Sequence, residues 1–172
     1  MRVLYGMLLM LLLLVVAGIL FIYSGFYNVA ASVPHAALTR WATHTTMHYS
    51  VEARSDAIRV PNLDDSQMIA RGARTYEEMC VACHLKPGTD STALHKGLNP
   101  PPPNLTEEDD WAPAEQFWII DHGIKMSGMP AWGESHADKE IWEVVAFLQR
   151  LPELSEQQYI ELANPEKEGG AI

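Results

Sequence analysis

Two cysteines separated by two residues and followed directly by a histidine constrain this chain most strongly. The sequence reads Cys80-Val81-Ala82-Cys83-His84. This C-x-x-C-H spacing is the attachment signature of a c-type haem. Two thiols one short turn apart can each add to a haem vinyl group, and the histidine after them is then held against the iron as its proximal ligand. The motif therefore predicts a fold built around one covalently bound haem.

Two other kinds of site use a similar cysteine spacing. The chain contains only these two cysteines, so no thiol remains for a structural disulfide or for a zinc site of four cysteines. Thioredoxin-like chemistry expects a strand before the motif and a βαβ unit around it. The residues before Cys80 instead have apolar side chains at helical spacing. Haem attachment is therefore the preferred interpretation.

The N-terminal segment is long and apolar. Residues 3–23 are almost wholly apolar, and Arg2 is the only charge nearby. About 20 helical residues span a hydrocarbon core of about 30 Å. A cleaved signal peptide is the alternative, with a usual apolar core of about 7–15 residues, and residues 29–31 offer a small-residue cleavage site. The length favours an uncleaved signal-anchor. Arg2 favours a cytoplasmic N-terminus, so we expect the rest of the chain to be exported.

The negative charge is concentrated after residue 62. The whole chain carries −10. Residues 1–62 contain four arginines against Glu52 and Asp56, a balance of +2, so the remainder carries −12. This balance argues against nucleic acid and anionic lipid as partners. It permits steering toward a partner with a basic patch, and it fits a well-solvated surface equally well.

The first half of the chain predicts two helices. Residues 34–49 read as a short amphipathic helix, and residues 50–62 as an extended or irregular linker. A second helix begins at Asp64, Asp65 or Ser66, all good N-cap residues. It runs into the cysteine motif with apolar and small residues at helical spacing, namely Met68, Ile69, Gly72, Ala73, Tyr76 and Met79.

The second half of the chain alternates loops and helices. Residues 86–103 are rich in glycine and proline and read as a loop. Residues 114–122 predict a helix that ends at Gly123, and residues 125–133 read as a loop with two methionines. A last amphipathic helix over residues 138–151 stops at Pro152. Residues 155–162 predict a further short helix, and a polar, disordered tail is expected from residue 164.

A second axial ligand for the iron is expected from the methionine loop. A thioether is a soft ligand suited to haem iron. Met129 is flanked by Gly128 and Pro130, which restrict the backbone there, and Met126 is the rival three residues earlier. We favour Met129. Core packing of both methionines, and a histidine in place of Met129, are the alternatives.

In their order along the chain, these motifs resemble a class I cytochrome c. The resemblance covers residues 63–151: a helix leading into the cysteine motif, the Pro-Pro-Asn-Leu segment at 102–105, the Gly-Met-Pro loop at 128–130, and a last helix with aromatic residues. It implies an all-α fold, a small helical domain around one covalent haem c. The first and last helices of that fold cross closely, and Gly72 against Trp142 or Phe147 suits that crossing.

The resemblance also assigns roles to individual residues. It implies that Cys80 and Cys83 form the thioether bonds, and that His84 and Met129 are the iron ligands. Pro103 matches the proline whose carbonyl accepts a hydrogen bond from His84 Nδ1, which would orient the ring. The remaining haem-binding residues that it implies are Leu105, packed on the haem face, and Trp132, near the propionates.

The chain departs from the smallest members of that family. It has a run of four prolines where the family often has one, so a proline next to Pro103 is the alternative partner of His84.

We expect four segments: a transmembrane signal-anchor (1–23), a juxtamembrane segment with a short helix and linker (24–62), the cytochrome c domain (63–152) and a C-terminal extension (153–172). The whole chain resembles the membrane-anchored monohaem cytochromes of bacterial respiratory chains.

The expected function is electron transfer by an electron carrier rather than an enzyme. An iron bound by His84 and Met129 has no vacant position for substrate. The resemblance implies a haem domain on the periplasmic side of the bacterial inner membrane. The partners would be redox proteins: a quinol-oxidising complex, a periplasmic dehydrogenase or a terminal oxidase. Lysines 86, 96 and 125 are expected near the exposed haem edge. A fixed haem subunit of a larger oxidoreductase complex and a haem-based gas sensor are the alternatives.

Overall fold

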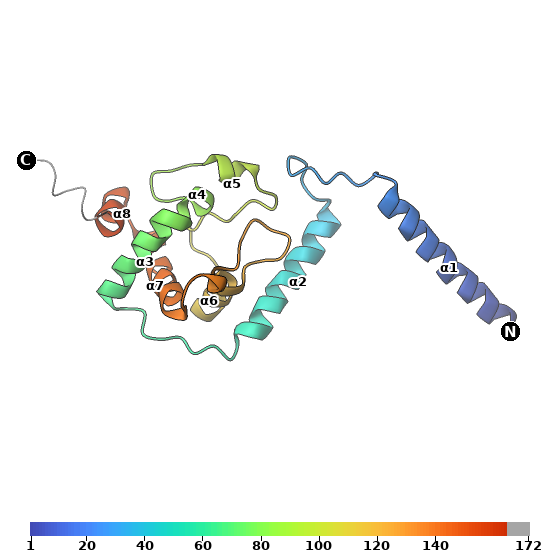
Figure 1. Cartoon of the computed structure of the whole chain (residues 1–172), viewed down its shortest axis with the longest axis horizontal. Coiled ribbons are helices and arrows are strands. Elements are labelled where there is room, and N and C mark those ends of the chain that lie inside the picture. Colours follow the sequence, from blue (N-terminus) through green and yellow to red (C-terminus); the bar gives the residue numbers. More distant parts are fainter. Residues whose placement is uncertain (165–172) are drawn as a thin grey trace, which may run out of the picture. The chain divides into compact units, whose positions relative to one another are not determined.

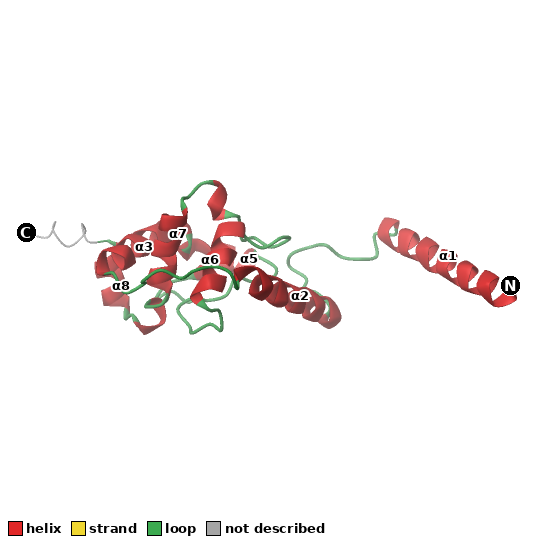
Figure 2. Cartoon of the chain, turned by 90° about the horizontal axis from the view of Figure 1, so that it is seen from below, coloured by secondary structure: helices red, strands yellow, loops and turns green. Residues whose placement is uncertain are grey.

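The computed structural model describes residues 1–164, and within them it contains helices and loops but no strand (Figure 2). The predicted all-α fold is therefore confirmed. The α-helices are α1 (Arg2–Tyr23), α2 (Ala37–Ser55), α3 (Ser66–Met79), α4 (Val81–His84), α5 (Ala93–Gly97), α6 (Pro113–His122), α7 (Asp138–Leu148) and α8 (Glu156–Ala163). Two 3₁₀ turns, η1 (Trp132–Glu134) and η2 (Leu151–Glu153), complete the secondary structure of these residues. The polar tail was expected from residue 164, and residues 165–172 of it lie outside the described residues.

The chain divides into two units, the first Met1–Val33 and the second from Pro34 onward. The first unit contains α1, the long N-terminal helix drawn in blue in Figure 1. By length and composition α1 can cross a membrane, although a signal sequence near an N-terminus passes the same test. The second unit contains all the other helices, including α2.

Capping side chains set the starts of the two central helices. The Asp65 carboxylate accepts hydrogen bonds from the backbone N–H groups of Gln67 (2.8 Å) and Met68 (3.3 Å). The start of α3 at the predicted N-cap is therefore confirmed. At the start of α7, the Glu140 carboxylate accepts a hydrogen bond of 2.9 Å from the backbone N–H of Ala137.

The close packing of α3 on α7 depends on Gly72 (Figure 1). A Cβ atom at this position would lie 1.9 Å from the Glu143 carbonyl oxygen and 3.0 Å from Phe147 Cβ. The expected role of Gly72 is confirmed, and Phe147 rather than Trp142 is its aromatic neighbour. Trp142 instead stacks on Phe117 of α6, with ring centroids 4.3 Å apart.

The main core forms where α3, α7 and α8 meet. Its buried residues are Ala73, Tyr76, Val144, Phe147, Leu148, Leu151, Tyr159 and Ala163. The predicted helix over residues 155–162 is confirmed as α8, which inserts Tyr159 and Ala163 into this core. Because these side chains are shielded from water, α8 is an integral part of the domain rather than an appendage.

Three predicted elements differ from those observed. Residues 50–55 are helical rather than irregular, because α2 continues to Ser55 and buries Val51 and Ser55 where it packs beside α6 (Figure 1). The loop predicted over residues 86–103 contains α5, whose start is capped by Thr92. The helix predicted over residues 138–151 ends at Leu148, and η2 follows it.

The packing at Gly72 predicts a large effect of one methyl group. Gly72→Ala would force the α7 backbone away from α3, so we expect the free energy of unfolding to fall by about 3 kcal/mol, the upper end of the usual cost of overpacking. Urea unfolding of the haem-loaded protein measures this change. Gly97→Ala is the matched control, because a Cβ there meets no atom within 4 Å. It should change stability by less than about 1 kcal/mol. Equal effects of the two substitutions would contradict the proposed close contact.

Candidate functional site

The cysteine motif forms a short turn directly after α3. Cys80 N–H donates to the Tyr76 carbonyl (2.9 Å), which ends α3, and the Cys80 carbonyl accepts from His84 N–H (2.8 Å), which begins α4. Both cysteines are half-buried and carry free thiols. The helix geometry therefore places Cys80 and Cys83 within one turn of backbone, as double attachment to a single group requires.

His84 is held through one ring nitrogen. Its Nδ1 lies 3.0 Å from the carbonyl oxygen of Pro103. A carbonyl oxygen can only accept, so Nδ1 carries the hydrogen and the Nε2 lone pair is left for a metal. Burial lowers the pKa of His84, the hydrogen bond to Pro103 opposes that shift, and the nearby His95 adds to it. The neutral ring, which is the form that binds metals, is therefore favoured.

The chain leaves the turn through an unusual backbone conformation. Leu85 has a φ angle of 66°, in the left-handed region, although it is not glycine. Two contacts hold it there: its side chain is buried, and its carbonyl accepts a hydrogen bond of 2.7 Å from the Tyr76 hydroxyl. The same hydroxyl lies 3.3 Å from the His84 carbonyl. Strained conformations of this kind persist where surrounding contacts hold them. Here the contacts of Leu85 set the direction in which the chain leaves the turn.

Residues 80–85, which we call the haem turn, meet the proline segment at residues 102–105. Leu105 N–H donates to the His84 carbonyl (3.1 Å), next to the contact between Pro103 and the His84 ring. Leu105 is partly buried against the main core. Cys80 is also packed against that core, and its burial, with a smaller effect of Cys83, raises the pKa of its thiol to about 12. The part of the site formed by Cys80 and Leu105 is therefore apolar, and the carbonyls of His84 and Pro103 beside it have hydrogen-bond donors.

The methionine loop is closed by Gly123. Gly123 has a φ angle of 64°, and a Cβ there would lie 2.6 Å from the Pro130 carbonyl carbon. The Met129 carbonyl accepts from Ile124 N–H (3.2 Å), and Met129 N–H donates to Ser127 Oγ (3.1 Å). Within this loop Met129 is half-buried, whereas Met126 is 99% exposed.

The structure groups the predicted site residues into two sets. Contacts around the haem turn join Cys80, Cys83, His84, Pro103 and Leu105. Met129 belongs to a second segment, over residues 123–134, and its hydrogen bonds stay within that segment. The second segment also contains Trp132, which is half-buried and meets the ring of His136 edge-on at 5.5 Å. A contact between Leu98 and Gly128 connects the loop after α5 to this second segment.

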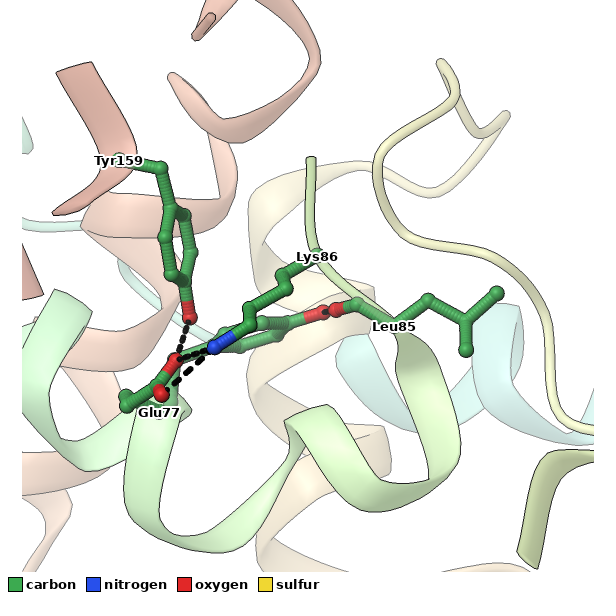
Figure 3. Close-up of polar contacts among 5 residues, drawn as sticks. Glu77, Leu85, Lys86 and Tyr159 are labelled. Atoms are coloured by element: carbon green, nitrogen blue, oxygen red, sulfur yellow. Dashed lines mark hydrogen bonds and ion pairs between the residues drawn. The ribbon is translucent and has the colours of Figure 1, made fainter. Parts of the chain in front are cut away.

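Sequence reasoning missed a polar network beside the turn (Figure 3). The Glu77 carboxylate accepts hydrogen bonds from Lys86 Nζ (2.8 Å) and from the Tyr159 hydroxyl (2.7 Å), and Lys86 Nζ lies 5.7 Å from the centre of the Tyr159 ring. Lys86 therefore forms an ion pair within the domain, whereas the side chains of Lys96 and Lys125 are exposed. No local pattern joins residues 77 and 159, so only the fold reveals this network.

Comparisons with known proteins identify the class of this domain. Residues 67–148 match the family described as Cytochrome C oxidase, cbb3-type, subunit III. Comparison with curated proteins and with solved structures gave no match. The chain contains a class I c-type cytochrome domain, preceded by a candidate membrane span. Such a domain supports haem-based electron transfer and implies haem c as its cofactor.

The residues present fit a bound haem. Nδ1–H of His84 donates to the Pro103 carbonyl, so Nε2 carries the lone pair that an iron-binding histidine uses. The two thiols lie on one turn, and neither is used in a disulfide. A thioether is available in the half-buried Met129. These donors match the soft sulfur and imidazole ligands that haem iron accepts in proteins.

The buried Tyr76 hydroxyl predicts a measurable stability effect. Tyr76→Phe removes the donor to the Leu85 carbonyl and leaves that buried acceptor unpaired, so we expect a loss of about 2 kcal/mol. Thermal and urea unfolding of the haem-loaded protein measure it. Tyr49→Phe, at an exposed tyrosine of α2, is the control and should leave stability unchanged. A Tyr76→Phe variant as stable as wild type would show that the hydroxyl contributes nothing.

Proposed function

We propose that this protein is a membrane-tethered electron-transfer cytochrome c in which His84 and Met129 would be the protein ligands of the haem iron. The observation that carries the proposal is the hydrogen bond between His84 Nδ1 and the Pro103 carbonyl. That contact orients the ring and raises its basicity, and it is the usual support of a metal-binding histidine. We further propose that Cys80 and Cys83 attach one haem covalently.

Each residue has a distinct task in this proposal. Bound haem supplies a one-electron couple between ferrous and ferric iron. His84 would bind the iron through its Nε2 lone pair, and Met129 would bind it through its thioether sulfur. Leu105 would pack against the apolar part of the haem, and Trp132 would offer its indole N–H to the propionates. Iron bound by both residues would have no open position for a substrate, which favours an electron carrier over an enzyme.

The charge distribution supports protein partners. The segment after residue 62 carries −12, from the difference between −10 for the chain and +2 for residues 1–62. We propose single-electron exchange with a quinol-oxidising complex, a periplasmic dehydrogenase or a terminal oxidase, steered by this field. Lys86, Lys96 and Lys125 were expected near the haem edge. Because Lys86 is paired with Glu77, the exposed Lys96 and Lys125 are the two of these lysines that are available to a partner.

The proposed location is the periplasmic face of a bacterial inner membrane. The long apolar helix α1 supports a single-pass anchor, with Arg2 on the cytoplasmic side. Tethering raises the effective concentration of the haem domain near membrane-bound redox complexes. A carrier held at the membrane would therefore need only modest affinity for its partners.

A second candidate is a fixed haem subunit of a larger membrane complex. The matched family is described as a subunit of a cbb3-type cytochrome c oxidase, and α2 exposes Leu38, Trp41 and Tyr49, apolar surface that a neighbouring subunit would cover. Size analysis after mild detergent extraction separates the two candidates. A free carrier elutes as a small species, whereas a fixed subunit elutes with its complex.

Covalent attachment is tested through the cysteines. If Cys80 and Cys83 bond the haem, colour should stay with the polypeptide through denaturation and acid-acetone extraction. Replacing both by alanine should leave either extractable haem or none, as measured by the absorbance of the protein fraction. Haem that remains covalently bound in the double variant would overturn the assignment.

The distal ligand is tested by comparing the two loop methionines. Ferric wild-type protein should have the weak far-red band of a thioether–iron bond, and ferrous wild-type protein should not bind carbon monoxide. Met129→Ala should abolish the band and allow carbon monoxide to bind, because it opens one face of the iron. Absorption spectra with and without the gas measure both effects.

Met126→Ala is the matched control, because its side chain is almost fully exposed. It should leave both spectra unchanged. Loss of the band in Met126→Ala alone would move the ligand to Met126. Absence of the band in wild type, without carbon monoxide binding, would favour a histidine ligand. Binding of carbon monoxide by wild-type protein would favour a gas sensor.

A further inference from the structure

The haem turn is too short to satisfy its own backbone. α4 contains four residues, so the carbonyl groups at its end cannot all find partners within the helix. Buried or half-buried carbonyls without partners are costly. The structure supplies partners from outside the turn, and those from the following loop have no role yet in the proposed function.

Two side chains at the start of α5 bind consecutive carbonyls of the turn. The Thr92 hydroxyl donates to the Ala82 carbonyl, and His95 Nδ1 lies 2.9 Å from the Cys83 carbonyl. Thr92 Oγ1 also accepts a hydrogen bond of 3.0 Å from His95 N–H. Thr92 and His95 are therefore locked to each other as well as to the turn, and we call this pair the α5 clasp.

The α5 clasp lies partway along the loop that carries Pro103. The loop leaves the turn at Leu85 and returns when the Pro103 carbonyl meets the His84 ring. Without the α5 clasp, residues 86–102 would connect these two points. With it, only residues 96–102 separate His95 from Pro103. A shorter free segment has less conformational entropy to lose when Pro103 is held in place.

We propose that Thr92 and His95 are positioning residues for the iron ligand: they hold the loop so that the Pro103 carbonyl stays on His84 Nδ1 and fixes the orientation of the ring. This inference rests on the proposed function, in which His84 binds haem iron. Neither residue donates to the iron in this arrangement. Both act through the backbone of the turn and through Pro103.

The exchange of the His84 ring N–H with solvent tests the α5 clasp directly. The haem-loaded full chain is kept in its ferrous, diamagnetic state, and proton NMR measures the exchange rate of His84 Nδ1–H. His95→Ala should make this exchange about tenfold faster, which corresponds to a loss of about 1.4 kcal/mol from the closed state. Thr92→Val removes both the hydroxyl donor to the Ala82 carbonyl and the acceptor of the His95 N–H, and it should act in the same direction.

Conservative variants and a distant control separate positioning from general stability. In His95→Asn the side-chain amide can replace Nδ1–H as donor, so exchange should return toward the wild-type rate, and Thr92→Ser should also retain that rate. Arg150→Ala removes an exposed ion pair of 2.7 Å with Asp64, at the opposite end of α3 from the haem turn. It should leave the exchange of His84 Nδ1–H unchanged even if it lowers the melting temperature.

The outcomes distinguish this inference from the proposed function. Unchanged exchange in both His95→Ala and Thr92→Val, or equal acceleration in Arg150→Ala, would overturn the α5 clasp as a positioning device. In either case, iron ligation by His84 would still be supported if the ring signals of His84 in wild type are shifted by the haem ring current. Absence of those shifted signals in wild type would instead overturn the proposed function.

Discussion

The rest of the haem domain depends on the contact between α3 and α7 at Gly72. Because no side chain separates the helices, the α7 carbonyl at Glu143 approaches the α3 backbone directly. One turn further along α3, Tyr76 packs against Phe147, with ring centroids 5.3 Å apart. α3 ends at Met79, and Cys80 follows as its C-cap. The helix crossing thus sets where the cysteine motif begins.

From that point, hydrogen bonds to backbone carbonyls control the site. Tyr76, Leu105 and His95 donate to carbonyls of the haem turn, and the Pro103 carbonyl accepts from the His84 ring. Backbone groups are a suitable means of fixing a ligand, because they are attached to the chain without free side-chain rotation. Apolar contacts of α3, α7 and α8 stabilise the domain, whereas these polar contacts give the turn one defined conformation.

The C-terminal helix α8 extends this arrangement beyond the region that matches the cytochrome family. Tyr159 is buried in the core and donates to Glu77, and Glu77 also pairs with Lys86, two residues after His84. Burial and the bond to Glu77 raise the pKa of the Tyr159 hydroxyl, so it remains a protonated donor. A pair of opposite charges with a third hydrogen-bond donor is better satisfied than an isolated pair. Through Tyr159 and Glu77, α8 is therefore connected to Lys86, next to the haem turn.

Local spacing in the sequence determined the class of the domain. The cysteine motif and the Asp65 cap each act within a few residues, so the pattern alone predicted the haem turn and the start of α3. The helix crossing at Gly72 was implied by the resemblance to class I cytochromes c. The tertiary structure decided the remaining features. Partners such as Tyr76 and Leu85, or Glu77 and Tyr159, depend on which helices pack together.

Packing also decided two elements that the sequence pattern misassigned. The last turn of α2 is helical where its residues are buried beside α6, and the loop before Pro103 folds into α5, where Thr92 binds both His95 and the haem turn. Which distant segments bury or hydrogen-bond to each other leaves no signal in the sequence, because the energy of these contacts depends on three-dimensional position rather than on spacing along the chain.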